Sequence, residues 1–449
     1  ANTIAPAQSS TLTPDLSGPA SLPDDTPRGF ARWWQLILGV ICMSMIANLQ
    51  YGWTLFVNPI QDRHHWGLPA IQVAFSIFVL VETWLVPFEG YLVDRFGPQM
   101  VGVTSGILVA AAWTIDAYAN TIPALYVGAI VGGIGAGGVY GACVGNALKW
   151  FPDRRGLAAG VTAMGFGAGS ALTVYPIANM IQARGYEAAF LKFGIAQGAV
   201  VFIVGWFLRG PQVSGAARDP GRTSGSTANV RDKREYTPLE MLRSPAFWVM
   251  YVMFMLTASG GLIMTAQIKP IAKTYGIGDA QAVLLGLTVA TVPFTLSMSR
   301  ILNGVSRPFF GWLSDRFGRE RTMSAAFMLE AIGFYLISRL AAHPAAFVVL
   351  TGILFFAYGE IYSLFPAACA DSYGRRYVSA NAGLLYTAKG AAALLVPLSG
   401  IIAVSAAGWN QLFVILAFMN VAAAALAVVA MKPLRERLRG GHEQPMMTP

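Results

Sequence analysis

The chain of 449 residues is apolar and carries few charges. Hydrophobic residues make up 55% of it and charged residues 12%, about half the charged share of a soluble domain. The formal net charge of +9 lies in short clusters between apolar runs, a pattern of membrane-surface loops that argues against nucleic-acid binding. Cys42, Cys143 and Cys369 have no paired spacing and no nearby histidine, so neither a metal site nor a cofactor is expected.

The sequence predicts an all-α integral membrane protein embedded in lipid. Residues 1–32 are expected to form a flexible cytoplasmic tail, because the first 28 or so are polar and lack the apolar core of a signal peptide. Six apolar runs of spanning length then make up a predicted N-terminal bundle, 33–209, with helices at 33–57, 70–92, 100–118, 123–150, 156–181 and 188–209.

A second set of six runs follows a polar linker, 210–243. These runs form a predicted C-terminal bundle, 244–431, with helices at 245–268, 281–314, 320–340, 345–370, 378–403 and 409–431. A basic tail, 432–449, closes the chain. The prediction is therefore twelve transmembrane helices in two six-helix bundles.

The distribution of Lys and Arg predicts the orientation. With both termini in the cytoplasm, the cytoplasmic segments hold 22 of the 31 Lys and Arg residues and the outer segments hold six. The remaining three, Arg300, Arg307 and Lys389, lie within predicted helices. This bias follows the positive-inside rule, so we expect a multi-pass protein of the cell (inner) membrane with both ends inside.

The two halves carry a repeated motif. GYLVDRFGPQM at 90–100 matches GWLSDRFGRER at 311–321, an offset of 221 residues. The arginine pairs after the fourth and tenth runs, Arg154-Arg155 and Arg375-Arg376, show the same offset. Two loop pairs at one offset indicate duplicated halves in parallel orientation.

The repeated G-x-L-x-D-R-x-G turn resembles the characteristic loop of the major facilitator superfamily. The resemblance implies that the Asp and Arg of each turn latch the cytoplasmic side of the two bundles. We therefore expect a gating role for the motif residues and the repeated arginine pairs, namely Asp94, Arg95, Asp315, Arg316, Arg154, Arg155, Arg375 and Arg376.

Further stretches resemble the oxalate:formate antiporter family within this superfamily. They are QYGWTLFVNP (50–59), VYGACVGNALKWFPDRRGLAAG (139–160), NGVSRPFFGWLSD (303–315), EIYSLFPAACAD (360–371) and YTAKG (386–390). The resemblance implies that Arg307 and Lys389 are anion ligands. It also implies an aromatic box and neighbouring polar groups at Tyr51, Tyr140, Tyr358, Tyr362, Tyr386, Gln50 and Trp53. Tyr358 and Tyr386 stand where the family often has Trp, so the fine substrate preference stays open.

The residues themselves point to the same chemistry. Arg307 lies ~12 Å and Lys389 ~20 Å inside the predicted membrane ends at 1.5 Å per residue. Two buried cations among tyrosines can desolvate a small carboxylate, with Arg offering a bidentate fork and Lys a point charge. Asn303 lies one turn before Arg307. This part of the chain resembles the distantly related proton-coupled monocarboxylate transporters, which carry Asp at the position of Asn303. Asn cannot titrate, which favours anion exchange.

Further charges at membrane depth are Arg300, Glu82, Glu360 and Glu89, of which Glu89 adjoins the latch loop. Three unpaired cations in one cavity would repel one another, so Arg300 is expected to need an acidic partner. Glu360 has a similar depth and lies in the same half. We predict an Arg300–Glu360 ion pair, which leaves Arg307 and Lys389 as the unpaired cations of the site. Glu82 is expected either to pair or to take up a proton.

These features predict a secondary transporter of small carboxylates that works by alternating access, with oxalate:formate-type exchange and no enzymatic activity. The protein is expected to work as a monomer on oxalate, formate or a monocarboxylate. The alternative is proton-coupled symport of a monocarboxylate through Glu82 or Glu360. Outside transport, a membrane enzyme would need a catalytic set that the four histidines do not supply. A transporter-like sensor is a further alternative, and would need an appended signalling domain.

Overall fold

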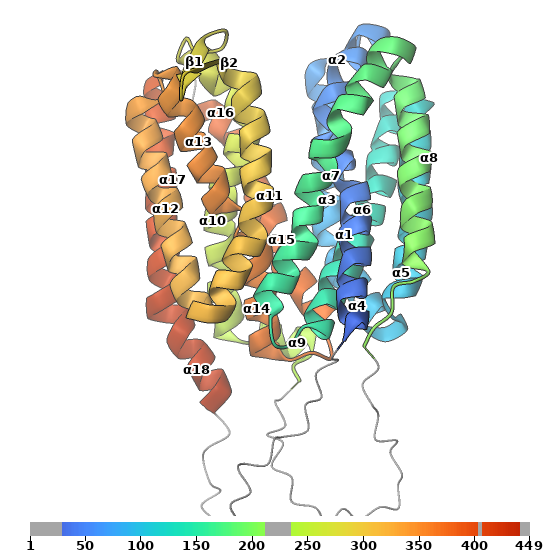
Figure 1. Cartoon of the computed structure of the whole chain (residues 1–449), viewed down its shortest axis with the longest axis vertical. Helices are drawn as coiled ribbons and strands as arrows, with labels where there is room; N and C mark the ends of the chain where they lie inside the picture. Colours follow the sequence, from blue (N-terminus) through green and yellow to red (C-terminus); the bar gives the residue numbers. More distant parts are fainter. Residues whose placement is uncertain (1–28, 212–234, 403–405, 441–449) are drawn as a thin grey trace, which may run out of the picture.

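The computed structural model describes residues 29–211, 235–402 and 406–440. Two helical bundles stand side by side (Figure 1). The first half contains α1 (Phe30–Tyr51), α2 (Trp53–His64), α3 (Leu68–Trp84), α4 (Val86–Phe96), α5 (Pro98–Ala117), α6 (Ile122–Trp150), α7 (Arg155–Arg184) and α8 (Tyr186–Gly205).

The second half begins after residues 212–234, which lie outside the described residues. Its elements are α9 (Pro238–Leu242), α10 (Pro245–Thr274), β1 (Gln281–Leu284), β2 (Leu287–Ala290), α11 (Thr291–Phe317), α12 (Arg319–Leu340), α13 (Pro344–Tyr358), α14 (Ile361–Tyr373), α15 (Val378–Ala393), α16 (Leu395–Ile402), α17 (Ala406–Leu426), the π-helical turn η1 (Ala427–Met431) and α18 (Lys432–Gly440).

Broken helices account for the difference between the element list and the twelve predicted spans. Within the described residues nine helical segments are long and apolar enough to cross a membrane, and the bent pair α3–α4 makes a tenth. The two others are α11, which carries Arg300 and Arg307, and α15–α16, which is interrupted at Leu394 and carries Lys389. With α2 continuing α1, the twelve-segment layout of an all-α membrane protein is confirmed.

The predicted helix at 281–314 is wrong in its first third. Residues 281–290 form an antiparallel hairpin instead, with Leu284 paired to Leu287. Leu285 and Gly286 between the strands have φ of 49° and 83°, as a two-residue type I′ turn requires. The run QAVLLGLTVA is apolar but rich in β-branched residues on both sides of this turn, so its hydropathy alone is misleading.

The ends of the bundles also differ from the prediction. α1 begins at Phe30, within the predicted tail 1–32, and α18 extends the last helix to Gly440, within the predicted tail 432–449. Residues 1–28 and 441–449 lie outside the described residues. The start of α1 and the helix α18 lie at the lower end of Figure 1, which we call the terminal end, and α2 and the hairpin lie at the far end.

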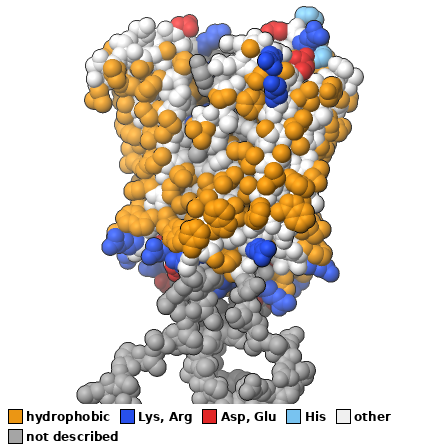
Figure 2. All heavy atoms as spheres, turned by 45° about the vertical axis from the view of Figure 1, so that its right-hand side comes forward, with side chains coloured by type: hydrophobic (Ala, Val, Ile, Leu, Met, Phe, Trp, Pro, Cys, Tyr) orange, Lys and Arg blue, Asp and Glu red, His pale blue; other side chains and the backbone are white. Residues whose placement is uncertain are grey.

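The surface suits a membrane. Figure 2 shows hydrophobic side chains in a broad belt, with Lys and Arg gathered mainly at the terminal end. Large hydrophobic side chains of the long helices are exposed, such as Leu172 (75% exposed), Phe418 (70%) and Ile203 (57%). Side chains of this kind are stable at the surface when they face lipid rather than water.

Candidate functional site

Arg307 connects the two halves near the middle of the molecule. It belongs to α11 of the second half and is 2% exposed. Its Nη1 donates to the backbone oxygen of Ala163 in α7 of the first half at 2.6 Å. Its Nη2 donates to Asn303 Oδ1 at 2.7 Å and to the Tyr51 hydroxyl at 3.4 Å. All three acceptors are neutral, so hydrogen bonds fix the guanidinium without cancelling its charge.

Lys389 has a carboxylate partner from the other half, contrary to our expectation of an unpaired cation. Its Nζ lies 3.4 Å from Glu82 Oε2 and donates to the Tyr386 hydroxyl at 2.7 Å. Lys389 is 2% exposed and Glu82 is completely buried. An ion pair this far from water is strong in isolation, but each partner has lost its hydration. Glu82 therefore neutralises Lys389 in this conformation.

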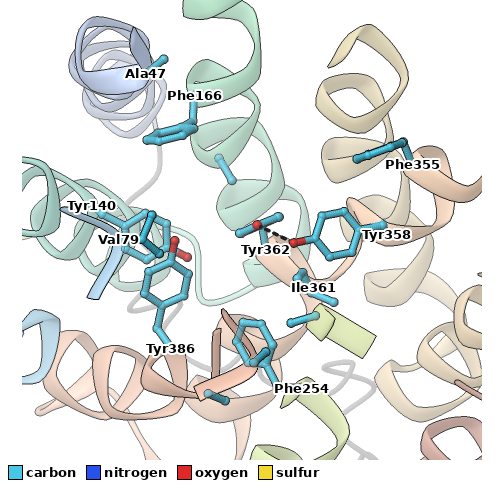
Figure 3. Packing of buried hydrophobic residues seen from close by; sticks show 14 of the residues in the cluster. Ala47, Val79, Tyr140, Phe166, Phe254, Phe355, Tyr358, Ile361, Tyr362 and Tyr386 are labelled. Atoms are coloured by element: carbon cyan, nitrogen blue, oxygen red, sulfur yellow. Dashed lines mark hydrogen bonds between the residues drawn. The ribbon is translucent and has the colours of Figure 1, made fainter. Parts of the chain in front are cut away.

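Four of the five predicted box tyrosines lie close together in the interior (Figure 3). Tyr140 and Tyr386 stack with ring centres 4.2 Å apart, and the hydroxyls of Tyr358 and Tyr362 lie 3.1 Å apart. The ring centre of Tyr362 is 4.1 Å from Arg307 Cζ and 5.7 Å from Lys389 Nζ. Its π face attracts both cations, so Tyr362 is a neutral spacer between them.

Tyr51, the fifth tyrosine, lies beside a pocket that opens between the halves. The pocket is lined by Tyr51 and Gly167 of the first half and by residues of the second, Thr265, Ile268, Leu296, Ser299, Arg300, Asn303, Phe355 and Tyr358. Asn303 and Tyr51 are the two side chains that accept hydrogen bonds from Arg307. The pocket therefore reaches the immediate partners of the buried guanidinium.

The predicted Arg300–Glu360 ion pair is wrong. Arg300 stacks over Tyr51, with Cζ 5.0 Å from the ring centre. Both carboxylate oxygens of Glu360 are buried and have no hydrogen-bond partner among the described residues. Glu360 lies at the junction of α13 and α14 and is completely buried. Equal depth in the membrane thus did not place the two groups on facing sides.

Gln50 and Trp53 lie on either side of the α1–α2 break at Gly52. Both are buried, and neither Gln50 Oε1 nor Trp53 Nε1 has a hydrogen-bond partner among the described residues. A direct role at the site stays a prediction for both. Asn303, in contrast, is fixed from two sides, because it also donates to the backbone oxygen of Phe355 at 3.2 Å.

The two motif aspartates join the halves at the terminal end. Asp94 accepts hydrogen bonds from Ser379 N (3.3 Å) and Ala380 N (2.9 Å), at the start of α15 in the other half. Asp315 accepts from Gly156 N (3.0 Å) and Leu157 N (2.8 Å), at the start of α7. A carboxylate satisfies free N–H groups and the helix dipole at a helix N-terminus. We call these reciprocal contacts the latch.

The motif arginines do not take part in the latch. Arg95 and Arg316 are exposed and stack on Phe96 and Trp312. Arg154 lies beside the neighbouring Asp153 (3.8 Å), and Arg376 stacks on Tyr377. For these four the gating prediction lacks a contact between the halves among the described residues, because their long side chains extend into water.

Other cations hold the latch instead. Lys149 pairs with Asp94 at 2.6 Å and Arg319 with Asp315 at 2.6 Å. Arg155, whose gating role stays a prediction, crosses between the halves to Asp371 at 2.7 Å. Arg375 also crosses, donating to the Lys149 backbone oxygen at 2.7 Å. Sequence reasoning missed Lys149, Arg319 and Asp371, although all three lie within a few residues of the repeated loops.

The glycines of the motif are explained by the same contacts. A Cβ at Gly90 would overlap the backbone of Ser379, and one at Gly311 would overlap the backbone of Gly156. The first Gly of each motif therefore lets its helix touch the backbone of the opposite half. The last Gly ends the helix with a positive φ, 89° at Gly97 and 95° at Gly318, a backbone conformation that favours glycine.

Replacing Asp315 with Asn is expected to open the terminal end. Asn has one acceptor oxygen and no charge, so one N–H at the start of α7 loses its partner and Arg319 keeps only Asp371 as a carboxylate partner. Hydrogen bonds to a charged group contribute about 1.5–3 kcal/mol, which shifts a population by about tenfold or more. Spin labels at the exposed positions Arg95→Cys and Arg376→Cys should report a longer distance in the variant. Asp62→Asn, exposed at the far end, is the control, and an unchanged distance distribution would contradict the latch.

Comparison with known proteins agrees with the fold and the motifs. The sequence pattern of the Major Facilitator Superfamily matches residues 36–305 and 283–446. The chain belongs to this superfamily of secondary transporters. The oxalate:formate antiporter of Oxalobacter formigenes is 35% identical over 397 residues, covering 88% of this chain and 90% of the antiporter.

Two solved structures share the fold of this superfamily member. The proton:xylose symporter XylE aligns with a TM-score of 0.68 at 13% identity, covering 89% of this chain and 96% of XylE. FucP in its outward conformation aligns with a TM-score of 0.65 at 14% identity, covering 89% of this chain and 99% of FucP. At these identities the similarity shows the fold alone. Membership of the superfamily makes this chain a multi-pass membrane protein.

Proposed function

We propose that this protein exchanges small carboxylate anions, of the oxalate and formate type, across the cell membrane by alternating access. The observation that carries the proposal is the buried Arg307, whose hydrogen-bond acceptors among the described residues are all neutral. An arginine at this depth is costly unless an anion or a partner offsets it. The 35% identity to an oxalate:formate antiporter supports a carboxylate as that anion.

In this proposal Arg307 is the principal ligand and Lys389 is the second. A carboxylate can accept the guanidinium fork bidentately, while Tyr362 and the stacked pair Tyr140–Tyr386 form the walls. Lys389 becomes available when Glu82 leaves it. When no substrate is bound, the Arg307 charge has no anion to offset it, which disfavours closure of the two halves over the empty site. The transporter therefore changes sides mainly with a substrate bound, and this favours exchange.

The terminal end is cytoplasmic in this proposal. Its excess of Lys and Arg follows the positive-inside rule. The latch then closes the cytoplasmic side, and the pocket beside Tyr51 faces outward. We propose that the protein lies in the inner membrane and works as a monomer.

Uptake of labelled oxalate into proteoliposomes tests the exchange. Vesicles are preloaded with oxalate, formate, lactate or nothing, each with and without a pH gradient, and protein-free vesicles are the control. We expect uptake only where the lumen holds an exchangeable carboxylate.

Proton-coupled symport of a monocarboxylate is the second candidate, and the Glu82–Lys389 pair is the observation that favours it. Protonation of Glu82 would release Lys389 for a substrate carboxylate. Uptake into empty vesicles driven by the pH gradient alone would replace exchange with this mechanism.

A further inference from the structure

Arg300 is the cation of the site that the exchange mechanism does not use. It lines the same pocket as Tyr51 and Asn303, on α11 two helical turns before Arg307. No carboxylate lies within ion-pair distance of it, and no hydrogen bond engages its guanidinium, among residues 29–211, 235–402 and 406–440. Its contact there is the face of the Tyr51 ring, 5.0 Å from Cζ to the ring centre.

Stacking on Tyr51 leaves Arg300 able to bind an anion. The five N–H donors of a guanidinium point outward in its plane, whereas stacking occupies a face. The ring restricts the side chain without using its donors. The hydroxyl of the same ring accepts from Arg307 at 3.4 Å, so Tyr51 holds one guanidinium at its face and the other at its edge. The pocket runs from Arg300 to Asn303, which is bound to Arg307.

Lys389 is not free to serve as the second cation in this conformation, because Glu82 occupies it. Arg300 lines the pocket, and Arg307 lies directly behind two of the lining residues, Tyr51 and Asn303, which accept its hydrogen bonds. We propose that Arg300 is a second carboxylate subsite, which binds one end of a dicarboxylate whose other end is bound by Arg307. This inference rests on the proposed carboxylate transport. It adds that Arg300 makes the protein prefer dicarboxylates over monocarboxylates.

The test compares Arg300→Gln with wild type on two substrate series, oxalate, malonate and succinate against formate and lactate. Counterflow in proteoliposomes gives kcat and KM, and thermal unfolding in detergent gives binding without transport. We expect the KM of at least one dicarboxylate to rise by about tenfold or more, because a charge-assisted contact is lost. The monocarboxylate KM values and kcat should stay within about twofold, since Arg307 is intact.

Arg339→Gln is the matched control, because Arg339 is an exposed arginine that stacks on Tyr335 at 5.5 Å in the same half. Equal changes for mono- and dicarboxylates, or no change for either, would overturn the subsite. Arg300→Lys keeps the charge and should recover part of the dicarboxylate affinity. If Arg300→Gln is poorly produced, Arg300→Lys is compared with wild type in the unfolding assay instead. If wild type neither binds nor moves any carboxylate, the proposed function fails, whereas loss of the dicarboxylate effect alone overturns only this inference.

Discussion

Replacing Arg307 with lysine is expected to reduce carboxylate uptake to about a hundredth of wild type or less. Lysine keeps the charge but not the planar fork that donates at once to Ala163, Asn303 and Tyr51. Two charge-assisted hydrogen bonds contribute about 1.5–3 kcal/mol each, and 3 kcal/mol corresponds to roughly a hundredfold change in affinity. Initial uptake rates and substrate-induced thermal stabilisation measure the effect.

The control for Arg307→Lys is Arg316→Lys, a substitution on the same helix at an exposed arginine that stacks on Trp312. It should leave uptake unchanged. Both variants need equal yield and a single monodisperse peak, because damage to α11 would imitate lost binding. Wild-type uptake by Arg307→Lys would show that the guanidinium geometry has no part in transport.

Replacing Glu82 with glutamine is expected to destabilise the substrate-free protein and to increase its stabilisation by oxalate. The change leaves the buried Lys389 without its carboxylate, and breaking a buried ion pair costs about 3–5 kcal/mol. In wild type a substrate must compete with Glu82 for Lys389, and in the variant it does not. The thermal unfolding midpoint should therefore fall without substrate and rise further on its addition.

Two comparisons isolate this effect. Glu89→Gln changes a second buried acid, whose oxygens have no hydrogen-bond partner among the described residues, so no cation is left without its counter-ion. Glu82→Gln combined with Lys389→Met should regain much of the lost stability, because both charges are gone. If Glu82→Gln instead removes stabilisation by oxalate, Glu82 assists substrate binding and does not compete with it.

The twelve-segment layout was predictable from the sequence because span length and loop charge depend on local composition. The hairpin at 281–290 was not, since its residues are as apolar as a helix, and its β-branched residues and the Leu285–Gly286 turn do not change its hydropathy. The helix breaks at Gly52 and Leu394 were missed for a related reason, because hydropathy does not report backbone direction.

The residues of the central cluster were predictable as a group but not their pairing. Arg307, Lys389 and the tyrosines lie together because the halves face one another, whereas Glu82 and Lys389 are 307 positions apart. Whether such groups meet depends on the rotation of each helix about its axis, which depth in the membrane does not fix. The same uncertainty explains the wrong pairing of Arg300 with Glu360.

The latch gives the chain a property of symmetric dimers. In a two-fold interface each subunit offers the same group and receives the same group in return. Here Asp94 binds the start of α15 and Asp315 binds the start of α7, so one polypeptide contains both sides of an isologous contact. In a homodimer any mutation would alter both contacts. Since the two copies are separate in this chain, they have diverged, with lysine beside the first aspartate and arginine beside the second. Each contact can therefore be tuned without changing the other.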